Sequence, residues 1–210
     1  MGLLDTLLGR TKPVKANLDA LFALPSAAVT LATAAALVPS GQAGVCWKPP
    51  AGQSVTDLQA EINQLLDMPD DPMDDQTEGA TAITTPGAVP VMTQSEDAYG
   101  YRWLLLSDPN VEDLVTRVHV INSTLSDAGW GPQLLCSVFG LVPGPDAGPT
   151  TKPLYLVYLY KRGTFYPFAP DGKESRDTEL ELRIRAVLGS DLPIETDLSR
   201  WFPLWDLPVH

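Results

Sequence analysis

The chain has 210 residues, an apolar content of 44% and a formal net charge of −12. This apolar content can fill a sizeable core, which argues against intrinsic disorder of the whole chain. The negative charge repels a phosphate backbone and no local basic patch offsets it, so nucleic acid binding is not expected.

The two cysteines, Cys46 and Cys136, are widely separated, and each lies in an apolar context typical of a buried free thiol. The first residues lack the charged and apolar regions of a secretory signal. The longest uncharged run, residues 20–47, contains two prolines and is diluted by alanine and threonine, so it is a poor candidate for a membrane span. We therefore expect a reduced, cytoplasmic protein.

The N-terminal residues 3–8 predict a short amphipathic helix with a basic segment after it. Such a helix can lie on an anionic membrane, in the groove of a partner or on its own domain. A helix of only two turns binds a membrane or a partner weakly by itself, which favours packing on its own domain. The candidate contact residues are Leu3, Leu4, Leu7, Leu8, Arg10 and Lys12.

The next segments predict a short helix and then a hairpin. Asn17 caps the helix, and Pro25 ends it. Residues 26–38 alternate as a strand does, although their alanine-rich end also accepts a helix. A turn at 39–41 and a short returning strand then complete the hairpin.

Ser54 begins a clearer amphipathic helix that runs to Leu66. The composition then changes, because residues 67–97 are rich in Asp, Pro, Gly and Thr and have no sustained periodicity. They predict a long flexible insertion. Its aspartates lack the alternating spacing of a calcium loop, so a solvated acidic loop is expected.

Regular structure is predicted again from residue 101. Residues 101–107 read as a core strand, and Asp108–Pro109 starts a helix that Gly129 ends. A strand at 134–142 follows, and then a hairpin at 154–168 with a tight primed turn at Arg162–Gly163. The apolar face of the long helix consists of Val111, Leu114, Val115, Val118, Ile121 and Leu125.

The C-terminal part predicts one more helix and an aromatic tail. Helix formers and the terminal Gly189 favour a helix over residues 180–188, although part of it also alternates as a strand does. The tail, residues 198–210, carries Trp201, Phe202 and Trp205. Exposure of so much apolar surface is costly, so we expect docking on the sheet and leave contact with a partner open.

Catalytic chemistry finds little support in the sequence. Cys136 and His119 are a conceivable nucleophile and base, because a helix and the strand after it can be neighbours. Nothing supplies an orienting group or an oxyanion hole, and a packed structural role for His119 is preferred. The scattered Cys and His residues do not suit zinc, and the Gly-rich segment 140–148 joins two predicted strands, so neither a metal nor a cofactor is expected.

Three segments resemble the actinobacterial PspA-associated protein family PspAB. They are GLLDTLLGRTKPVKANLDALFALPSAAVTL, YRWLLLSD with DLVTRVHVINSTLSDAGWG and LLCSVFGL, and YLVYLYKRGTFYPFAP. The resemblance runs nearly end to end apart from the acidic insertion. It implies a small cytosolic accessory protein linked with PspA, the membrane-stress scaffold, and often with a membrane zinc protease of the HtpX type. The family offers no established active site to carry over.

The combined prediction is a single α+β domain, residues 1–210, with a mostly antiparallel sheet flanked by helices. Its order of elements, α-β-β-β-α-β-β-α with an inserted helix and loop, is similar to that of secretion-chaperone-like folds, which bind proteins. The expected function is non-enzymatic: an adaptor that binds PspA or associated membrane-stress proteins, with a homodimer left open. The alternatives are a membrane-surface protein using the N-terminal helix and a hydrolase using Cys136 or His119.

Overall fold

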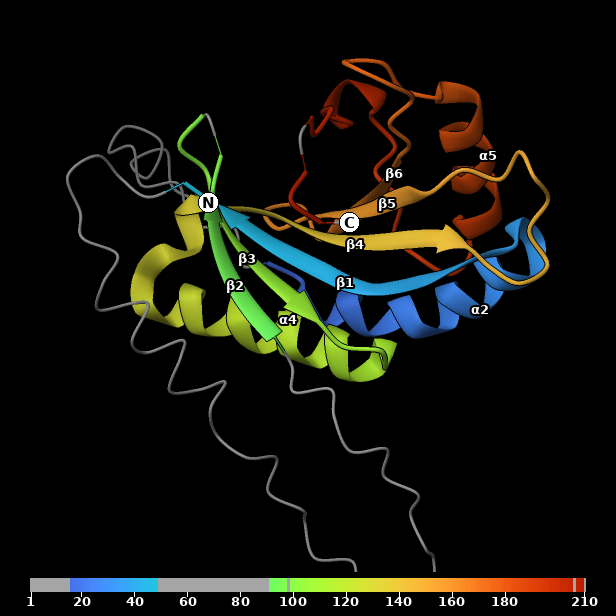
Figure 1. Ribbon diagram of the computed structural model, residues 1–210. Helices are drawn as coiled ribbons and strands as arrows, with labels where there is room; N and C mark the ends of the chain where they lie inside the picture. The colour runs from blue at the N-terminus through green and yellow to red at the C-terminus, as the bar shows by residue number, and fades with distance from the viewer. Residues whose placement is uncertain (1–15, 49–90, 98, 206, 210) are drawn as a thin grey trace, which may run out of the picture.

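The computed structural model describes residues 16–48, 91–97, 99–205 and 207–209 (Figure 1). Within them the chain forms a six-stranded sheet of order β2-β3-β1-β4-β5-β6, antiparallel at every pairing. The predicted α+β class is therefore confirmed. The strands are β1 (Leu37–Trp47), β2 (Val91–Glu96), β3 (Arg102–Ser107), β4 (Leu134–Pro143), β5 (Leu154–Leu159) and β6 (Thr164–Phe168).

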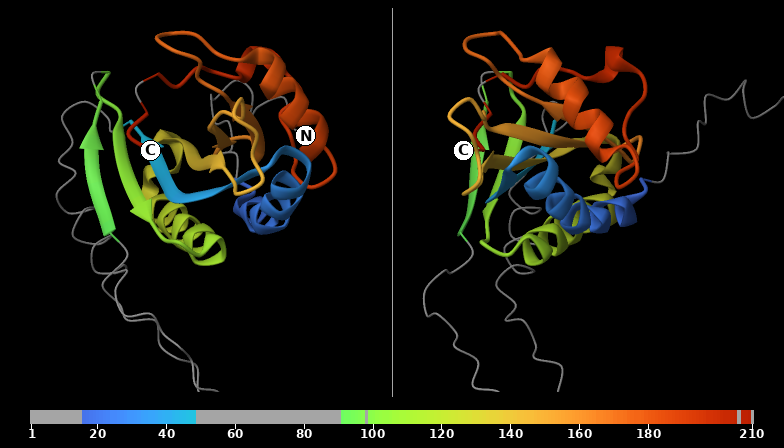
Figure 2. Two further views of the ribbon diagram at one scale, coloured as in Figure 1. Left: turned by 45° about the vertical axis from the view of Figure 1, so that its right-hand side comes forward. Right: turned by 90° about the vertical axis from the view of Figure 1, so that its right-hand side faces the viewer.

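The helices of the described chain lie mainly on one face of the sheet. α2 and α4 lie side by side along β1, and α5 packs beside α2 at the β6 end (Figures 1 and 2). The longer ones are α2 (Leu24–Ala35), α4 (Val111–Leu125) and α5 (Thr178–Leu188); the short ones are η1 (Leu18–Ala23), η2 (Ser126–Trp130), η3 (Gly131–Gln133) and η4 (Leu198–Arg200).

Each face of the sheet has its own apolar cluster, because side chains along a strand alternate between the two faces. On the helix face, β1 contributes Val45 and Trp47, and the predicted apolar face of α4 is buried except for the partly buried Val111. The opposite face is covered by the C-terminal tail. Its cluster comprises Cys46, Trp103, Cys136, Val138, Val157, Tyr166, Phe168, Trp201 and Leu207. Docking of the tail on the sheet is thus confirmed.

The strand predicted at residues 26–38 is wrong, since Leu24–Ala35 forms α2. Pro25 occupies the first turn of this helix, where its missing N–H has no role, so it begins α2 instead of ending the preceding helix. Alanines favour the helix, and Ala36 ends it with a left-handed φ of 52°. Asn17 precedes the 3₁₀ helix η1 without making a side-chain cap hydrogen bond.

The segment Leu18–Ala35 is the part of the described chain that is long and apolar enough to cross a membrane by composition. Leu21, Leu24 and Leu31 are nevertheless buried along one side of it, against the sheet. One side of this segment therefore packs in the core, while its opposite side is exposed.

The predicted hairpin before residue 48 is also wrong, because the chain runs through Pro39–Gly41 as part of one long strand, β1. The pairing with β4 shifts register between Pro39 and Ala43, as a bulge does. Gly41 has a φ of +76°, and its carbonyl accepts the N–H of Asp108 at 2.8 Å. The bulge therefore absorbs the turn-forming residues without reversing the chain.

Three smaller predictions need correction. Residues 91–96, assigned to the insertion, form β2 at the edge of the sheet. Asn110, not Asp108, caps α4 by accepting the N–H of Glu112; Asp108 accepts the N–H of Asn110 instead. Strands β5 and β6 are joined by four residues, of which Gly163 has a positive φ of 68°, so the turn is not a two-residue primed turn.

The other strands and α5 agree with the predictions, and Gly129 has the expected left-handed φ of 89° just beyond α4. The predicted element order is not reproduced, because three strands, β4, β5 and β6, follow α4 instead of two. Before α4, a helix replaces the first predicted strand and β2 is an additional strand. The N-terminal helix, the helix at 54–66 and the insertion before residue 91 lie outside the described residues.

Candidate functional site

The most connected polar cluster lies where the C-terminal segment meets β6. The Phe165 N–H donates to the Pro193 carbonyl and the Glu195 N–H donates to the Phe165 carbonyl, both at 2.8 Å. Residues 193–195 thereby cover the outer edge of β6. This pairing carries the Glu195 side chain to the turn between β5 and β6.

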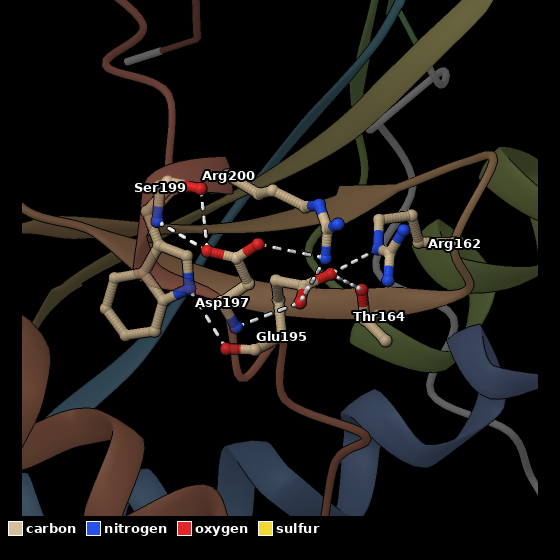
Figure 3. Close-up of polar contacts among 7 residues, drawn as sticks. Arg162, Thr164, Glu195, Asp197, Ser199 and Arg200 are labelled. Atoms are coloured by element: carbon tan, nitrogen blue, oxygen red, sulfur yellow. Dashed lines mark hydrogen bonds and ion pairs between the residues drawn. The ribbon is translucent and has the colours of Figure 1, made fainter.

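Glu195 is the centre of this cluster (Figure 3). Its carboxylate is 2% exposed and accepts hydrogen bonds from Arg162 Nε, from Thr164 Oγ1 at 3.2 Å and from the Asp197 N–H at 3.0 Å. Arg200 Nη1 lies 3.4 Å from the same carboxylate and 3.2 Å from Asp197 Oδ2. The Glu195 side chain therefore ties the hairpin turn to the first residues of the tail.

The electrostatics of Glu195 favour its ionised form. Desolvation opposes ionisation, but the hydrogen bonds from the Asp197 N–H, Arg162 and Thr164, together with the Arg162 charge, lower the pKa of Glu195 below its ordinary value. Arg162 and Arg200 remain 44% and 40% exposed, so the cations are partly hydrated while the carboxylate is covered.

This cluster is better suited to holding the C-terminal segment in place than to catalysing a reaction. Ser199 Oγ donates to Asp197 Oδ1 at 2.6 Å, but the hydrogen bonds from Ser199 and the charge of Arg200 lower the pKa of Asp197, and such a carboxylate is a poor base for activating a hydroxyl. His119, the histidine within the described residues, lies on α4, where its ring contacts Phe22 at 4.9 Å and its Nε2 lies 4.0 Å from Asp19. The cluster is thus best understood as the anchor of the tail.

Two of the three tail aromatics predicted as contact residues pack on the protein itself. Trp201 is buried, is stacked on Tyr166 at 5.9 Å and donates through Nε1 to the Glu195 carbonyl at 3.1 Å. Trp205 meets Phe168 edge-on at 5.4 Å and is partly buried. Phe202 is 58% exposed, so it is the tail aromatic that is most available to another molecule.

The sequence did not anticipate the Glu195 cluster. Arg162 was predicted only as a residue of the hairpin turn, whereas in the structure it also pairs with a buried carboxylate. Thirty-two residues of chain separate Arg162 from Glu195, and no spacing rule connects them. No signal in the sequence marked this pair, because Arg162 lies in a turn and Glu195 is one of several charged residues in its segment.

The Cys136 and His119 pair considered for a hydrolase is not formed. Cys136 belongs to the cluster beneath the tail, while α4, which carries His119, packs on the opposite face of the sheet. Among the described residues, no group of three His, Cys, Asp or Glu side chains can hold a metal ion. The N-terminal candidates Leu3, Leu4, Leu7, Leu8, Arg10 and Lys12 lie outside the described residues.

One cavity lies between the tail and the loop after β6. It has a volume of about 260 Å³ and is lined by residues that include Tyr155, Lys173, Glu174 and Trp205. Ligand pockets usually enclose about 300–1,000 Å³ and combine apolar walls with converging polar groups. This cavity is smaller than a typical ligand pocket, and the residues that line it do not form a recognisable catalytic group.

A second surface feature is the outward side of η1 and α2. Phe22, Ser26, Val29 and Thr33, spaced by four, three and four residues, form one exposed line that we call the α2 stripe. Phe22 and Val29 are 50% and 68% exposed. The Thr33 hydroxyl donates to the Val29 carbonyl at 2.9 Å, so even this polar group is partly turned to the helix backbone.

The α2 stripe is also uncharged, because no charged residue occurs between residues 20 and 47. Exposed helix faces normally carry charged side chains, and this chain has a net charge of −12. Isolated exposed apolar residues need no explanation, but a continuous neutral face is typical of an interaction surface.

Comparison with known proteins gives one match. The family model PspAB, described as PspA associated protein B, matches residues 1–209. No curated protein and no solved structure matches the chain.

Proposed function

The chain belongs to the PspAB family, PspA associated protein B, and we propose that it is a non-enzymatic adaptor that binds PspA through the α2 stripe. The family description, PspA associated protein B, supports PspA as the partner. The surface is inferred from the exposed residues of α2. The proposed setting is the cytoplasmic side of the membrane-stress response.

The observation that carries this proposal is that the α2 stripe is exposed and uncharged and includes two large apolar side chains, Phe22 and Val29. An interface core is depleted of charge, and large apolar side chains supply much of its binding energy. Phe22 is already held by its contact with the His119 ring, so little side-chain freedom would be lost when a partner covers it. Val120 on α4 is another exposed apolar residue of the helix layer, at 37%.

The proposal is tested by co-purification of the full-length protein with PspA. Val29→Glu places a charge in the centre of the stripe, and we expect about tenfold or more loss of affinity because the carboxylate would be desolvated without a partner. Since Val29 is 68% exposed, the variant should fold normally. Leu198→Glu is a matched control, because Leu198 is 49% exposed on η4, away from α2.

Two results would argue against the adaptor proposal. If the unmodified protein does not associate with PspA, the partner is wrong. If Val29→Glu and Leu198→Glu bind as well as the unmodified protein, the α2 stripe is not the contact surface. Equal circular dichroism spectra and melting temperatures for both variants are required before binding is compared.

Peripheral binding to a membrane is the second candidate, because the predicted N-terminal amphipathic helix, with Arg10 and Lys12 after it, would suit an anionic lipid surface. The two candidates differ in their salt dependence. Binding to anionic vesicles that uses Arg10 and Lys12 would weaken as ionic strength rises, whereas an apolar contact with PspA would change little. Flotation with anionic liposomes at low and high salt separates them.

A further inference from the structure

We propose that Cys46 and Cys136 are a redox couple that closes a disulfide within the folded protein when a hydroperoxide reaches them. The two residues are far apart in the sequence but are direct partners in the register of β1 and β4, at the centre of the sheet. Both are free thiols in the structure. This inference is independent of the proposed function.

The geometry of an antiparallel pair suits such a bond. Directly opposed residues have Cα atoms about 4.5 or 5.5 Å apart, depending on the hydrogen-bonding pattern, and their side chains lie on the same face. Disulfides span Cα separations of about 4.4–6.8 Å, so both kinds of pair fall within the accessible range. Cys46 and Cys136 indeed share one apolar cluster on that face.

The environment keeps this dithiol inactive in the resting protein. Cys46 is 3% and Cys136 is 6% exposed. The hydrogen bond to Cys136 and burial raise the pKa of the Cys46 thiol, so little of it is the reactive thiolate at neutral pH. The couple therefore requires a local opening before it can react.

The C-terminal tail is the element that must open. Val209 packs directly on Gly44, which precedes Cys46 by two residues on the same face of β1: a Cβ atom at Gly44 would lie 2.9 Å from Val209 Cγ2. The Tyr155 hydroxyl holds this end of the tail by donating to the Val209 carbonyl at 2.9 Å. Release of that contact would expose the strand segment that carries Cys46.

The reaction consumes one hydroperoxide for each disulfide. One cysteine, as its thiolate, attacks the peroxide; an S–O bond forms, the O–O bond breaks and the distal oxygen leaves as water or alcohol after protonation. The second thiol attacks the sulfenic sulfur, so that the S–S bond forms, the S–O bond breaks and a water molecule leaves. Two thiols are oxidised by two electrons in total, and a dithiol reductant restores them by exchange.

The test uses the reduced full-length protein and hydrogen peroxide. We expect the intact mass to fall by two hydrogen atoms, a peptide map to join Cys46 to Cys136, and dithiothreitol to reverse both changes. Tyr155→Phe should form the disulfide several-fold faster, because it removes the hydroxyl that anchors Val209. Tyr158→Phe is the matched control: its hydroxyl donates to the Asn17 carbonyl, on the helix face, so the oxidation rate should stay unchanged.

Three outcomes would overturn the proposal. The first is that the native protein stays fully reduced under conditions that oxidise the urea-unfolded chain. The second is that disulfides form between different molecules instead of between Cys46 and Cys136. Equal oxidation rates for Tyr155→Phe and Tyr158→Phe would refute control of access by the tail. Cys46→Ser and Cys136→Ser should each abolish the mass change that corresponds to the disulfide.

Discussion

Glu195 offers the sharpest test of how the C-terminal segment is attached. Glu195→Ala removes the acceptor shared by Arg162, Thr164 and the Asp197 N–H, while Glu195→Gln keeps the size of the side chain but not its charge. A hydrogen bond to a charged group contributes about 1.5–3 kcal/mol when its partner is left without a substitute. Several such contacts would be lost together.

Solvent limits this loss. Because the two arginines are 44% and 40% exposed, water can replace the carboxylate around them, and the cost is below the 3–5 kcal/mol typical of a fully buried broken pair. We expect Glu195→Ala to lower the free energy of unfolding by about 2–3 kcal/mol and Glu195→Gln by about 1–2 kcal/mol. Urea unfolding at pH 7, followed by tryptophan fluorescence, measures both.

The pH dependence provides an internal check. The pKa of Glu195 is lower in the folded than in the unfolded protein, so the folded state binds fewer protons. The stabilisation is present in full above the ordinary glutamate pKa of about 4.3 and is lost as the pH falls through the lower folded value. The difference between the unmodified protein and Glu195→Gln should therefore shrink in that range. A difference that is absent at pH 7 or independent of pH would refute the reasoning.

Three further substitutions and one control substitution test the local structure by urea unfolding at pH 7. Asn110→Ala removes the cap that accepts the Glu112 N–H and should cost about 1 kcal/mol; no loss would contradict capping by Asn110. Gly163→Ala should cost more than about 1 kcal/mol, because φ is +68° and the new Cβ would lie 2.9 Å from Asn17 Cβ, whereas Gly148→Ala, with no atom within 4 Å, should have little effect. Arg176→Ala leaves the Glu181 carboxylate, 1% exposed, without its cation and should cost about 3 kcal/mol; an unchanged midpoint would show that the pair adds nothing.

The sequence predicted elements well where their periodicity was sustained and their ends were marked. The apolar repeat of α4 extends over 15 residues, and β3, β4 and β5 are short, nearly continuous apolar runs, as is typical of strands covered on both faces. Even there the cap was misplaced by two residues, from Asn110 to Asp108, because both side chains accept backbone hydrogen bonds at the start of this helix. The local sequence alone therefore does not tell which of the two residues is the N-cap.

The errors lie where local signals were ambiguous and tertiary contacts decided. Residues 26–38 accept either helix or strand, and the buried side of α2 against the sheet selects the helix. Pro39 and Gly41 are turn formers, yet pairing with β4 on one side and the contact with Asp108 on the other extend the strand through them. The partners concerned are about 65–100 residues away in the chain, so no window of sequence contains them.

The candidate site was the least predictable part for the same reason. Glu195 acquires its role from a pairing between residues 193–195 and β6, and the α2 stripe became visible only once the helix was placed. The absence of charge between residues 20 and 47 was apparent in the sequence, but it was considered only as a membrane span. An uncharged run can form a core, a span or an exposed interface, and the orientation of the helix distinguishes these.

The sheet keeps the two proposed activities physically apart. The α2 stripe belongs to the helix layer, whereas Cys46 and Cys136 lie on the opposite face, beneath the tail that Glu195 and Tyr155 hold in place. A partner bound to the stripe would therefore cover neither the dithiol nor the tail. Substitutions that loosen the tail can change oxidation without removing a binding contact, and Val29→Glu can change binding without exposing the cysteines. The two proposals can thus fail separately, which makes each experiment decisive for its own surface.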